Sequence, residues 1–419
     1  GAVTGASSYN GIPFFTDVTN ASMYTANVSA TDDTAQFNAG YGFLALDAVT
    51  TGDQNTAVGY VALTATTTGF GNVAIGAFAG DALISGYRNV AIGNLALSTE
   101  DGHGLNVAVG YAALKSQNAG AHAYNVAVGA SAGELITTGL QNTVVGGEAL
   151  ATNVDGDDNV AIGYHALKTF ESDTDGHGSN TAVGSLAMRD ATTGVNNTGI
   201  GQFAMGDGVV TGDENVAVGM HSMRNVTSTE YSTAIGAKAM GAGVTTGNYN
   251  TALGYEAGKA MTSGAENTLV GAKAGDALTS GTHNTAVGYE ALTTETNRGK
   301  NTAIGASALK VLNSGNQGHN TAVGSDAGTA MTTGVQNVVI GSLAGDALTT
   351  GEGNVVVGKS ALSTEVAGGK NTAIGARSQE DLNNNGNGNN VSVGFESMLN
   401  ASTAIGNTAI GSSAIGGGV

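Results

Sequence analysis

Two acidic stretches hold the side chains best suited to bind a metal ion. Asp155 and Asp157 lie in the first stretch, and Glu171, Asp173 and Asp175 lie in the second. Ca²⁺ prefers several carboxylate and carbonyl oxygens, so a fold that stacks the two stretches would bring suitable ligands together. A calcium site formed by Asp155, Asp157, Asp173 and Asp175 is therefore one interpretation of these residues. A set of solvated loop acids is the preferred interpretation, because the ligand spacing of an EF-hand is missing.

Histidines are the other metal-ligating side chains of the chain. A zinc site needs two or three of them at ligand spacing, and no two lie at such a spacing within one repeat of the pattern described below. Exposed loop histidines are therefore the preferred interpretation. Cysteine is absent, which excludes thiol catalysis and cysteine-based metal sites. The seven histidines are His103, His122, His165, His177, His221, His283 and His319.

The sequence contains no arrangement typical of an active site. Cleavage of a polysaccharide requires paired carboxylates in a cleft, and proteins that bind sugars along a surface usually display aromatic rings. This chain has no Trp, and aromatic residues make up only 5% of it. Ser-His-Asp and phosphate-loop contexts are also missing, and the many glycines follow the repeat. We therefore predict a protein that is not an enzyme and needs no cofactor other than the calcium considered above.

A repeat of 17 residues defines the elements that position these side chains. Its core phrase, N-T/V-A-V/I-G, recurs from Asn38 to Asn390 and is clearest between Asn250 and Gly351. Insertions fall between phrases and leave the phrase intact. A short fixed period is the signature of a solenoid, in which each coil packs mainly on its neighbours. We use "coil" for one repeat and number its positions from the Asn.

The aligned columns predict which side chains lie inside each coil. The Val or Ile of position four, as in Val58, Val287 and Ile340, is predicted to form the buried core, because β-branched residues suit a strand interior. The Leu or Met of position nine is predicted to fill the core as well. The small Ala of position three, as in Ala57 and Ala74, points the opposite way along the strand. It is predicted to let three chains approach closely.

Glycine and asparagine columns make further predictions. The Gly of position five predicts a turn or a close approach of two backbones that a Cβ would block. The Gly that closes many coils, such as Gly69 and Gly86, is predicted to adopt a positive φ in a turn. Stacked Asn side chains are predicted to pass amide hydrogen bonds from coil to coil.

Together these patterns predict an all-β fold, a parallel β-solenoid of about 21 coils that forms a homotrimer. Residues 1–37 lack the phrase and are predicted to be an N-terminal cap or docking segment, and residues 38–401 form the solenoid. Residues 402–419 repeat a five-residue phrase and are predicted to be a tip or assembly segment. Since exposed strand edges invite pairing, this tail is expected to dock on its trimer mates or on the next particle, head to tail.

Charge and composition restrict the partners. The 33 acidic and 14 basic residues give a formal net charge of −19, which argues against nucleic acid or an anionic membrane as partner. No apolar run approaches the ~20 residues of a membrane-spanning helix, so no membrane insertion is expected. The absence of Cys fits secretion without disulfides, and any signal peptide is expected to have been removed.

The phrase, seen as NTAVGYEA at Asn284 and NVAIGAFA at Asn72, resembles the head repeats of trimeric autotransporter adhesins. It is also similar to the NTAVG repeats of phage tail fibres. These resemblances imply a left-handed parallel β-roll with three chains side by side, displayed outside a cell or on a virion. The adhesin head repeat is usually shorter than the 17 residues seen here.

The expected function is that of a structural extracellular fibre, a surface adhesin or a tail-fibre-like rod, for attachment or as a rigid spacer. A glycan or protein on a host surface is the expected receptor. One alternative is a polysaccharide-degrading tailspike. Another is an ice- or mineral-binding solenoid that uses rows of Thr, although Val73, Val90 and Val107 interrupt such a row.

Overall fold

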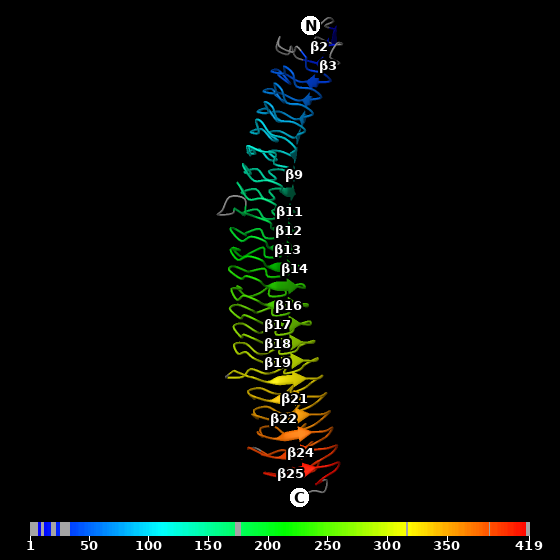
Figure 1. The fold of residues 1–419 in the computed structure, drawn as a ribbon, viewed down its shortest axis with the longest axis vertical. Helices are drawn as coiled ribbons and strands as arrows, with labels where there is room; N and C mark the ends of the chain where they lie inside the picture. Colours follow the sequence, from blue (N-terminus) through cyan, green and yellow to red (C-terminus); the bar gives the residue numbers. More distant parts are fainter. Residues whose placement is uncertain are drawn as a thin grey trace. The chain divides into compact units, whose positions relative to one another are not determined.

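The structure, a computed structural model of the 419-residue chain, describes residues 7–9, 12–17, 22–25, 34–171, 177–315, 317–384 and 386–415. The chain divides into two compact units, Gly1–Asp213 and Glu214–Val419. Within each unit, successive coils stack so that their short strands lie side by side (Figure 1). All regular elements of the described residues are β-strands, and these residues contain no helix long and apolar enough to cross a membrane.

Both units consist of three-residue strands, apart from one longer strand near the N-terminus. Unit 1 contains β1 (Ser7–Tyr9), β2 (Ile12–Asp17), β3 (Ser22–Tyr24), β4 (Ala39–Tyr41), β5 (Thr56–Val58), β6 (Val73–Ile75), β7 (Val90–Ile92), β8 (Val107–Val109), β9 (Val126–Val128), β10 (Thr143–Val145), β11 (Val160–Ile162), β12 (Thr181–Val183) and β13 (Thr198–Ile200). Unit 2 contains β14 (Val216–Val218), β15 (Thr233–Ile235), β16 (Thr251–Leu253), β17 (Thr268–Val270), β18 (Thr285–Val287), β19 (Thr302–Ile304), β20 (Thr321–Val323), β21 (Val338–Ile340), β22 (Val355–Val357), β23 (Thr372–Ile374), β24 (Val391–Val393) and β25 (Thr408–Ile410).

Strand pairing follows the repeat. Within each unit, neighbouring coil strands pair in parallel, and equivalent positions face one another, as Thr56 faces Val73. The chain is thus a parallel β-solenoid of about 22 turns with a 17-residue period, which confirms the predicted fold class. The N-terminal strands differ, since β1–β2 and β2–β3 pair antiparallel, whereas β3 joins β4 in parallel.

One more turn is present than the sequence predicts, because the strand ladder continues beyond residue 401. Strand β25 pairs in parallel with β24, and the N–H of Asn407 donates to Oδ1 of Asn390 at 3.0 Å. The start of the segment assigned to a C-terminal tail, 402–419, therefore contains a further coil strand.

The Asn column forms the predicted ladder of side-chain hydrogen bonds. Asn72 shows the pattern: its N–H and its Nδ2 both donate to Oδ1 of Asn55 in the preceding coil, at 3.0 and 3.1 Å. Its Nδ2 also donates to the carbonyl oxygen of Gly86, which closes the same coil, at 2.8 Å. Asn72 thus connects neighbouring coils and joins the two ends of its own coil, and most Asn residues of the column do the same, whereas Nδ2 of Asn106 and of Asn371 has no partner.

The two faces of each strand are the reverse of the prediction. Ala57 and Ala74 at position three are fully buried, whereas Val58 and Ile75 at position four are 37% and 40% exposed. The predicted Val/Ile core is therefore wrong, and so is the predicted contact face of Ala. Space is limited in many coils, since a Cβ added to Gly199 at position three would lie 2.7 Å from Cγ of Met188. Most coils therefore place a small Ala at position three, and only a few bury a larger side chain there, such as Leu269 and Val339.

Larger interior side chains come from positions nine and twelve. Leu63 at position nine is fully buried, which confirms the prediction that position nine fills the core. Thr66 at position twelve of the same coil is also fully buried. Where position nine is Gly, as at Gly80, position twelve carries the large side chain, here Leu83. Position twelve can also be charged: Glu100, Glu295 and Glu365 are fully buried.

Two glycine columns are explained by close backbone approach. Gly59 at position five has φ +143°, and a Cβ there would lie 2.4 Å from the carbonyl oxygen of Gly76, which confirms that prediction. The closing glycine does not adopt the predicted positive φ. A Cβ on Gly69 would instead lie 2.5 Å from the carbonyl oxygen of Gly86. Positive φ angles occur at non-glycine positions such as Leu63, at 50°.

Candidate functional site

The structure describes two of the four predicted calcium ligands. Oδ1 of Asp157 accepts a hydrogen bond from the N–H of Leu140 in the preceding coil, at 2.6 Å. Asp155 interacts with the carboxyl group of Glu171. Burial is the largest effect that raises the pKa of Glu171, and the charge and hydrogen bond of Asp155 raise it further. Asp173 and Asp175 lie outside the described residues, so the four-carboxylate site stays a prediction.

A different polar cluster is formed by Glu100, Asp101 and His103 in unit 1. One ligand atom of each residue lies within 4.8 Å of the others, and no other group of three His, Cys, Asp or Glu residues in the described ranges does so. Oε1 of Glu100 accepts a hydrogen bond from the N–H of His103 at 2.9 Å and lies 3.6 Å from Nδ1 of that imidazole. Asp101 is exposed, so the cluster reaches from the coil interior to solvent.

Two atoms of this cluster are buried without a hydrogen-bond partner, Oε2 of Glu100 and Nδ1 of His103. Burial raises the pKa of the Glu100 carboxyl, and the N–H and imidazole of His103 offset part of that effect. A buried polar atom without a partner loses its hydration and gains nothing in return, so such atoms are rare in native proteins. The cluster is therefore the least satisfied polar group of its coil.

His122 of the next coil extends the cluster. Its ring centroid lies 6.0 Å from that of His103, and its Nε2 lies 2.6 Å from the hydroxyl of Tyr87. Sequence reasoning missed this pair because it searched for ligands within one coil. The coil that begins at Asn106 is 19 residues long, and 19 residues also separate the two histidines. The equal spacing of 19 residues indicates that the two histidines occupy equivalent positions in neighbouring coils, and this could have been recognised from the sequence.

A row of half-exposed β-branched side chains follows position four in each unit. Each lies beside its equivalent in the neighbouring coil, because the strands pair in register. Continuous exposed apolar surfaces of this kind mark sites of association. Members exposed by 36 to 45% are Val58, Ile75, Val128, Val145, Ile162 and Ile200 in unit 1, and Ile235, Leu253, Ile304, Ile340 and Ile374 in unit 2.

Many aromatic rings also lie at the surface, and some stack from coil to coil. Phe70 stacks on Tyr87 with ring centroids 5.0 Å apart, and Tyr231 stacks on Tyr249 at 5.2 Å. Flat rings with a polar edge suit contacts with ligands that have one apolar face, such as sugar rings. The exposed rings are Phe37, Tyr41, Phe43, Tyr60, Phe70, Tyr111, Tyr124, Tyr164, Tyr231, Tyr249, Tyr255, Tyr289 and Phe395.

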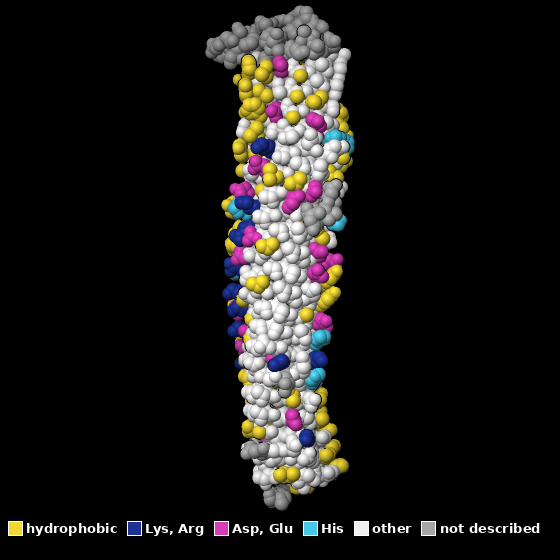
Figure 2. Space-filling view, turned by 90° about the vertical axis from the view of Figure 1, so that its left-hand side faces the viewer, with side chains coloured by type: hydrophobic (Ala, Val, Ile, Leu, Met, Phe, Trp, Pro, Cys, Tyr) yellow, Lys and Arg dark blue, Asp and Glu magenta, His cyan; other side chains and the backbone are white. Residues whose placement is uncertain are grey.

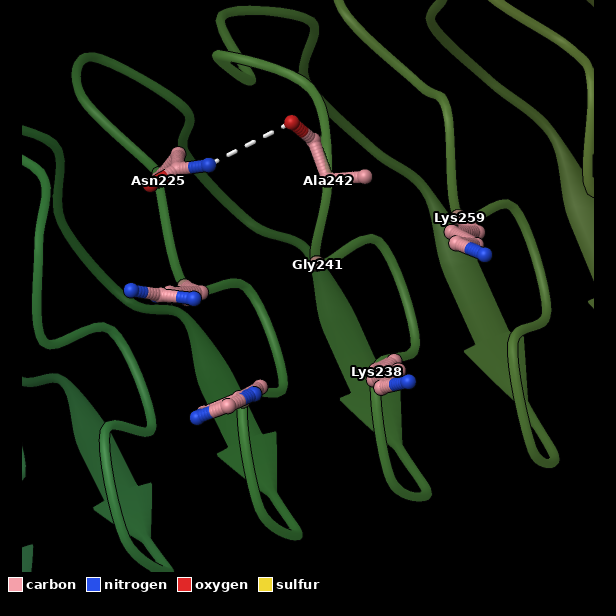
Figure 3. Close-up of a pocket in the computed structure, with 7 residues that line it drawn as sticks. Asn225, Lys238, Gly241, Ala242 and Lys259 are labelled. Atoms are coloured by element: carbon pink, nitrogen blue, oxygen red, sulfur yellow. Dashed lines mark hydrogen bonds between the residues drawn. The ribbon is translucent and has the colours of Figure 1, made fainter.

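Unit 2 carries a basic hollow of about 270 Å³ (Figure 3). It lies at Gly241, which has no side chain where the neighbouring coils carry Arg224 and Lys259. Lys238 and Lys259 also line it, and their ammonium groups lie 3.7 and 3.1 Å from Oε1 of Glu256. Burial alone would raise the pKa of Glu256, but hydrogen bonds from Lys259 and Tyr255 and the charges of Lys259 and Lys238 together outweigh it and lower the pKa.

Several basic side chains of unit 2 are paired with acids. Lys238 and Lys259 pair with Glu256, and Lys310 pairs with Glu290, so part of the basic charge is compensated locally. Figure 2 shows Lys and Arg side chains close to Asp and Glu side chains on one side of the view. The hollow can contact an anionic group of a ligand, but it contains no paired carboxylates or nucleophile among its lining residues.

No protein-family model matches the chain, and a search of curated proteins finds no match. The function therefore has to be inferred from the repeat and from the surfaces described above.

Proposed function

We propose that this chain is a structural segment of an extracellular fibre, without enzymatic activity, in which three chains associate side by side. It acts in attachment, as a surface adhesin or a virion tail-fibre-like segment, or as a rigid spacer. The observation that carries the proposal is the row of half-exposed Val, Ile and Leu at position four.

This row supports association because its chemistry is unusual for a surface that stays in water. Position four carries a β-branched side chain in nearly every coil, while charged residues are placed at other positions. A chain with a net charge of −19 has enough charged residues to make this face polar. An apolar row kept in register over many coils suits contact with an identical row of another chain.

The resemblance of the NTAVG phrase to adhesin head repeats and tail-fibre repeats supports the same proposal. The proposed trimer differs from the sequence prediction in the residues that form its contact. The Ala column lies inside the coils, so we place the contact on the Val/Ile row instead, with Val58 and Ile340 among its members.

The exposed aromatic rings are the proposed receptor-contacting groups. Stacked pairs such as Phe70–Tyr87 and Tyr231–Tyr249 provide apolar platforms on a polar protein. A host-surface glycan or protein is the proposed receptor, and the basic hollow at Gly241 would favour one that carries an anionic group.

A binding and product assay on immobilised polysaccharides tests the proposal. Labelled protein at micromolar concentration should be retained on at least one surface glycan, and chromatography of the supernatant should show no released oligosaccharide. A Tyr231→Ala, Tyr249→Ala double variant should lose retention, and a Gln317→Ala variant, at an exposed residue that is not aromatic, serves as the control. Release of oligosaccharides would replace this proposal with the tailspike alternative. Retention only on ice or mineral surfaces would favour the other alternative.

A further inference from the structure

Three coils carry a glutamate at position twelve, where most other coils place an uncharged residue such as Leu, Met or Thr. These are Glu100, Glu295 and Glu365, and each is fully buried. In each case the next coil is one of the long ones of 19 residues. The three sites therefore share their local sequence context, and they can be compared directly.

At two of these sites the buried carboxylate is fully hydrogen-bonded. Oε1 of Glu295 accepts two N–H groups of its own coil, and Oε2 accepts the N–H and hydroxyl of Ser314 in the next coil, both at 3.2 Å. Glu365 is held in the same way, with the N–H of Asn384 donating to its Oε2 at 3.0 Å. The protein thus satisfies a carboxylate at position twelve from two coils.

At Glu100 the second half of this arrangement is missing. Oε1 accepts the N–H of His103, but Oε2 has no hydrogen-bond partner, and Ala119 stands where Ser314 and Asn384 stand in the other two. The same coil differs in two further residues. Asp101 replaces Thr or Val, and His103 replaces Arg or Gly. Glu100, whose Oε2 lacks a hydrogen-bond donor, is therefore the only one of the three glutamates that is followed by a second carboxylate, Asp101, and an imidazole, His103.

We propose that Glu100, Asp101 and His103 bind a divalent first-row transition-metal ion, with Zn²⁺ as the ion of choice. The carboxylates of Glu100 and Asp101 and Nδ1 of His103 are the ligands, and water completes the coordination. The ion supplies the partner that Oε2 of Glu100 and Nδ1 of His103 lack. It also compensates two carboxylates, one of them fully buried.

The geometry and the donor atoms fit such an ion. Zn–N and Zn–O bonds of about 2.0–2.2 Å place tetrahedral ligand atoms about 3.3–3.6 Å apart. The three ligand atoms already lie within 4.8 Å of one another, so small side-chain rotations suffice. Gly102 lies in open space beside the cluster, since apart from its two chain neighbours a Cβ there would meet only Oγ of Ser85, at 3.5 Å. One imidazole with carboxylates suits Zn²⁺ better than Ca²⁺, which prefers oxygen ligands alone.

Isothermal titration calorimetry of the full chain with ZnCl₂, after treatment with EDTA, tests this site. Wild-type protein should bind one Zn²⁺ per chain. Asp101→Asn should weaken binding at least tenfold, and Asp101 is exposed, so folding should be unaffected. His103→Arg, which copies the residue found at Arg298, should abolish binding. The absorption spectrum of bound Co²⁺ gives a second readout of the nitrogen and oxygen ligands.

Two variants control for binding elsewhere on the chain. Glu365→Gln alters an equivalent buried carboxylate that has no histidine beside it, and His283→Ala removes a surface histidine that pairs with Glu266 at 2.7 Å. Both should bind Zn²⁺ as tightly as wild type. If Asp101→Asn and His103→Arg bind Zn²⁺ as tightly as wild type, the proposal is overturned. It is also overturned if His283→Ala loses as much Zn²⁺ affinity as these two variants, because the binding is then adventitious binding by surface histidines. Absence of wild-type binding at millimolar Zn²⁺ would overturn it as well.

Discussion

Val339 and Ile340 are neighbours in β21, and replacing each by Asp should have very different effects. Val339 is fully buried inside its coil, whereas Ile340 is 37% exposed on the outer face. The two substitutions are matched in strand, coil and introduced residue. They differ only in the side of the strand on which the carboxylate is placed.

The magnitudes follow from burial. Val339→Asp loses about 1.5–3 kcal/mol of apolar burial. Keeping the buried carboxyl protonated at pH 7, against an ordinary pKa near 3.9, costs about 4 kcal/mol more. The total of about 6 kcal/mol approaches the whole stability of a typical domain, which is about 5–15 kcal/mol. Ile340→Asp should cost roughly 1–2 kcal/mol within one chain, because its carboxylate keeps most of its water.

Thermal melting by circular dichroism and hydrogen exchange of the coils around β21 measure this difference. Val339→Asp should open the local coils, since each coil depends on its neighbours. Ile340→Asp should leave the coils protected but weaken association of chains at the outer row. Equal melting of the two variants, or greater loss in Ile340→Asp when both are monomeric, would refute the assignment of the two faces.

Three further predictions concern the hydrogen-bond ladder, the glycines and one partly buried acid, Asp346. Asn337→Ala should cost about 2–4 kcal/mol in denaturant unfolding, because it removes the side-chain partner of the buried N–H of Asn354 in the next coil and of the carbonyl oxygen of Gly351 in its own coil. Gly288→Ala should prevent local packing, since its Cβ would lie 2.5 Å from a carbonyl oxygen of the next coil, whereas Gly315→Ala, with nothing within 4 Å, should melt like wild type. Burial raises the pKa of Asp346 above its ordinary 3.8, so its ionisation opposes folding, and stability should fall as the pH rises through that raised pKa. Asp346→Asn should therefore raise the melting temperature at pH 7 and change it little at pH 3, and an equal rise at both pH values would contradict this account.

The repeat made the fold class predictable from the sequence, because a fixed period with recurring Asn and Gly leaves few other ways to bury the chain. Which face of each strand points into the coil was not predictable in the same way. Ala57 and Val58 alternate along the strand, and alternation alone does not say which face is enclosed. The choice depends on the space left by Leu63 and its equivalents, which is a property of the closed coil.

The polar cluster was missed for a related reason. His103 and His122 lie 19 residues apart in the sequence, and only stacking of a coil with the next longer one brings them together. Glu100 gave no signal of its own, because position twelve was not recognised as an interior position. Comparison of Glu100 with Glu295 and Glu365 at the same position would have been possible from sequence once that position was known.

The mass of the assembled protein in native solution tests the central claim most directly. Sedimentation equilibrium or native mass spectrometry at micromolar concentration should give three times the chain mass of 41.0 kDa. The Ile340→Asp variant, combined with Ile304→Asp on the same row, should shift the mass toward that of one chain while the coils stay folded. A wild-type mass of 41.0 kDa at micromolar concentration would contradict the account, because the Val/Ile row would then face water in the functional protein.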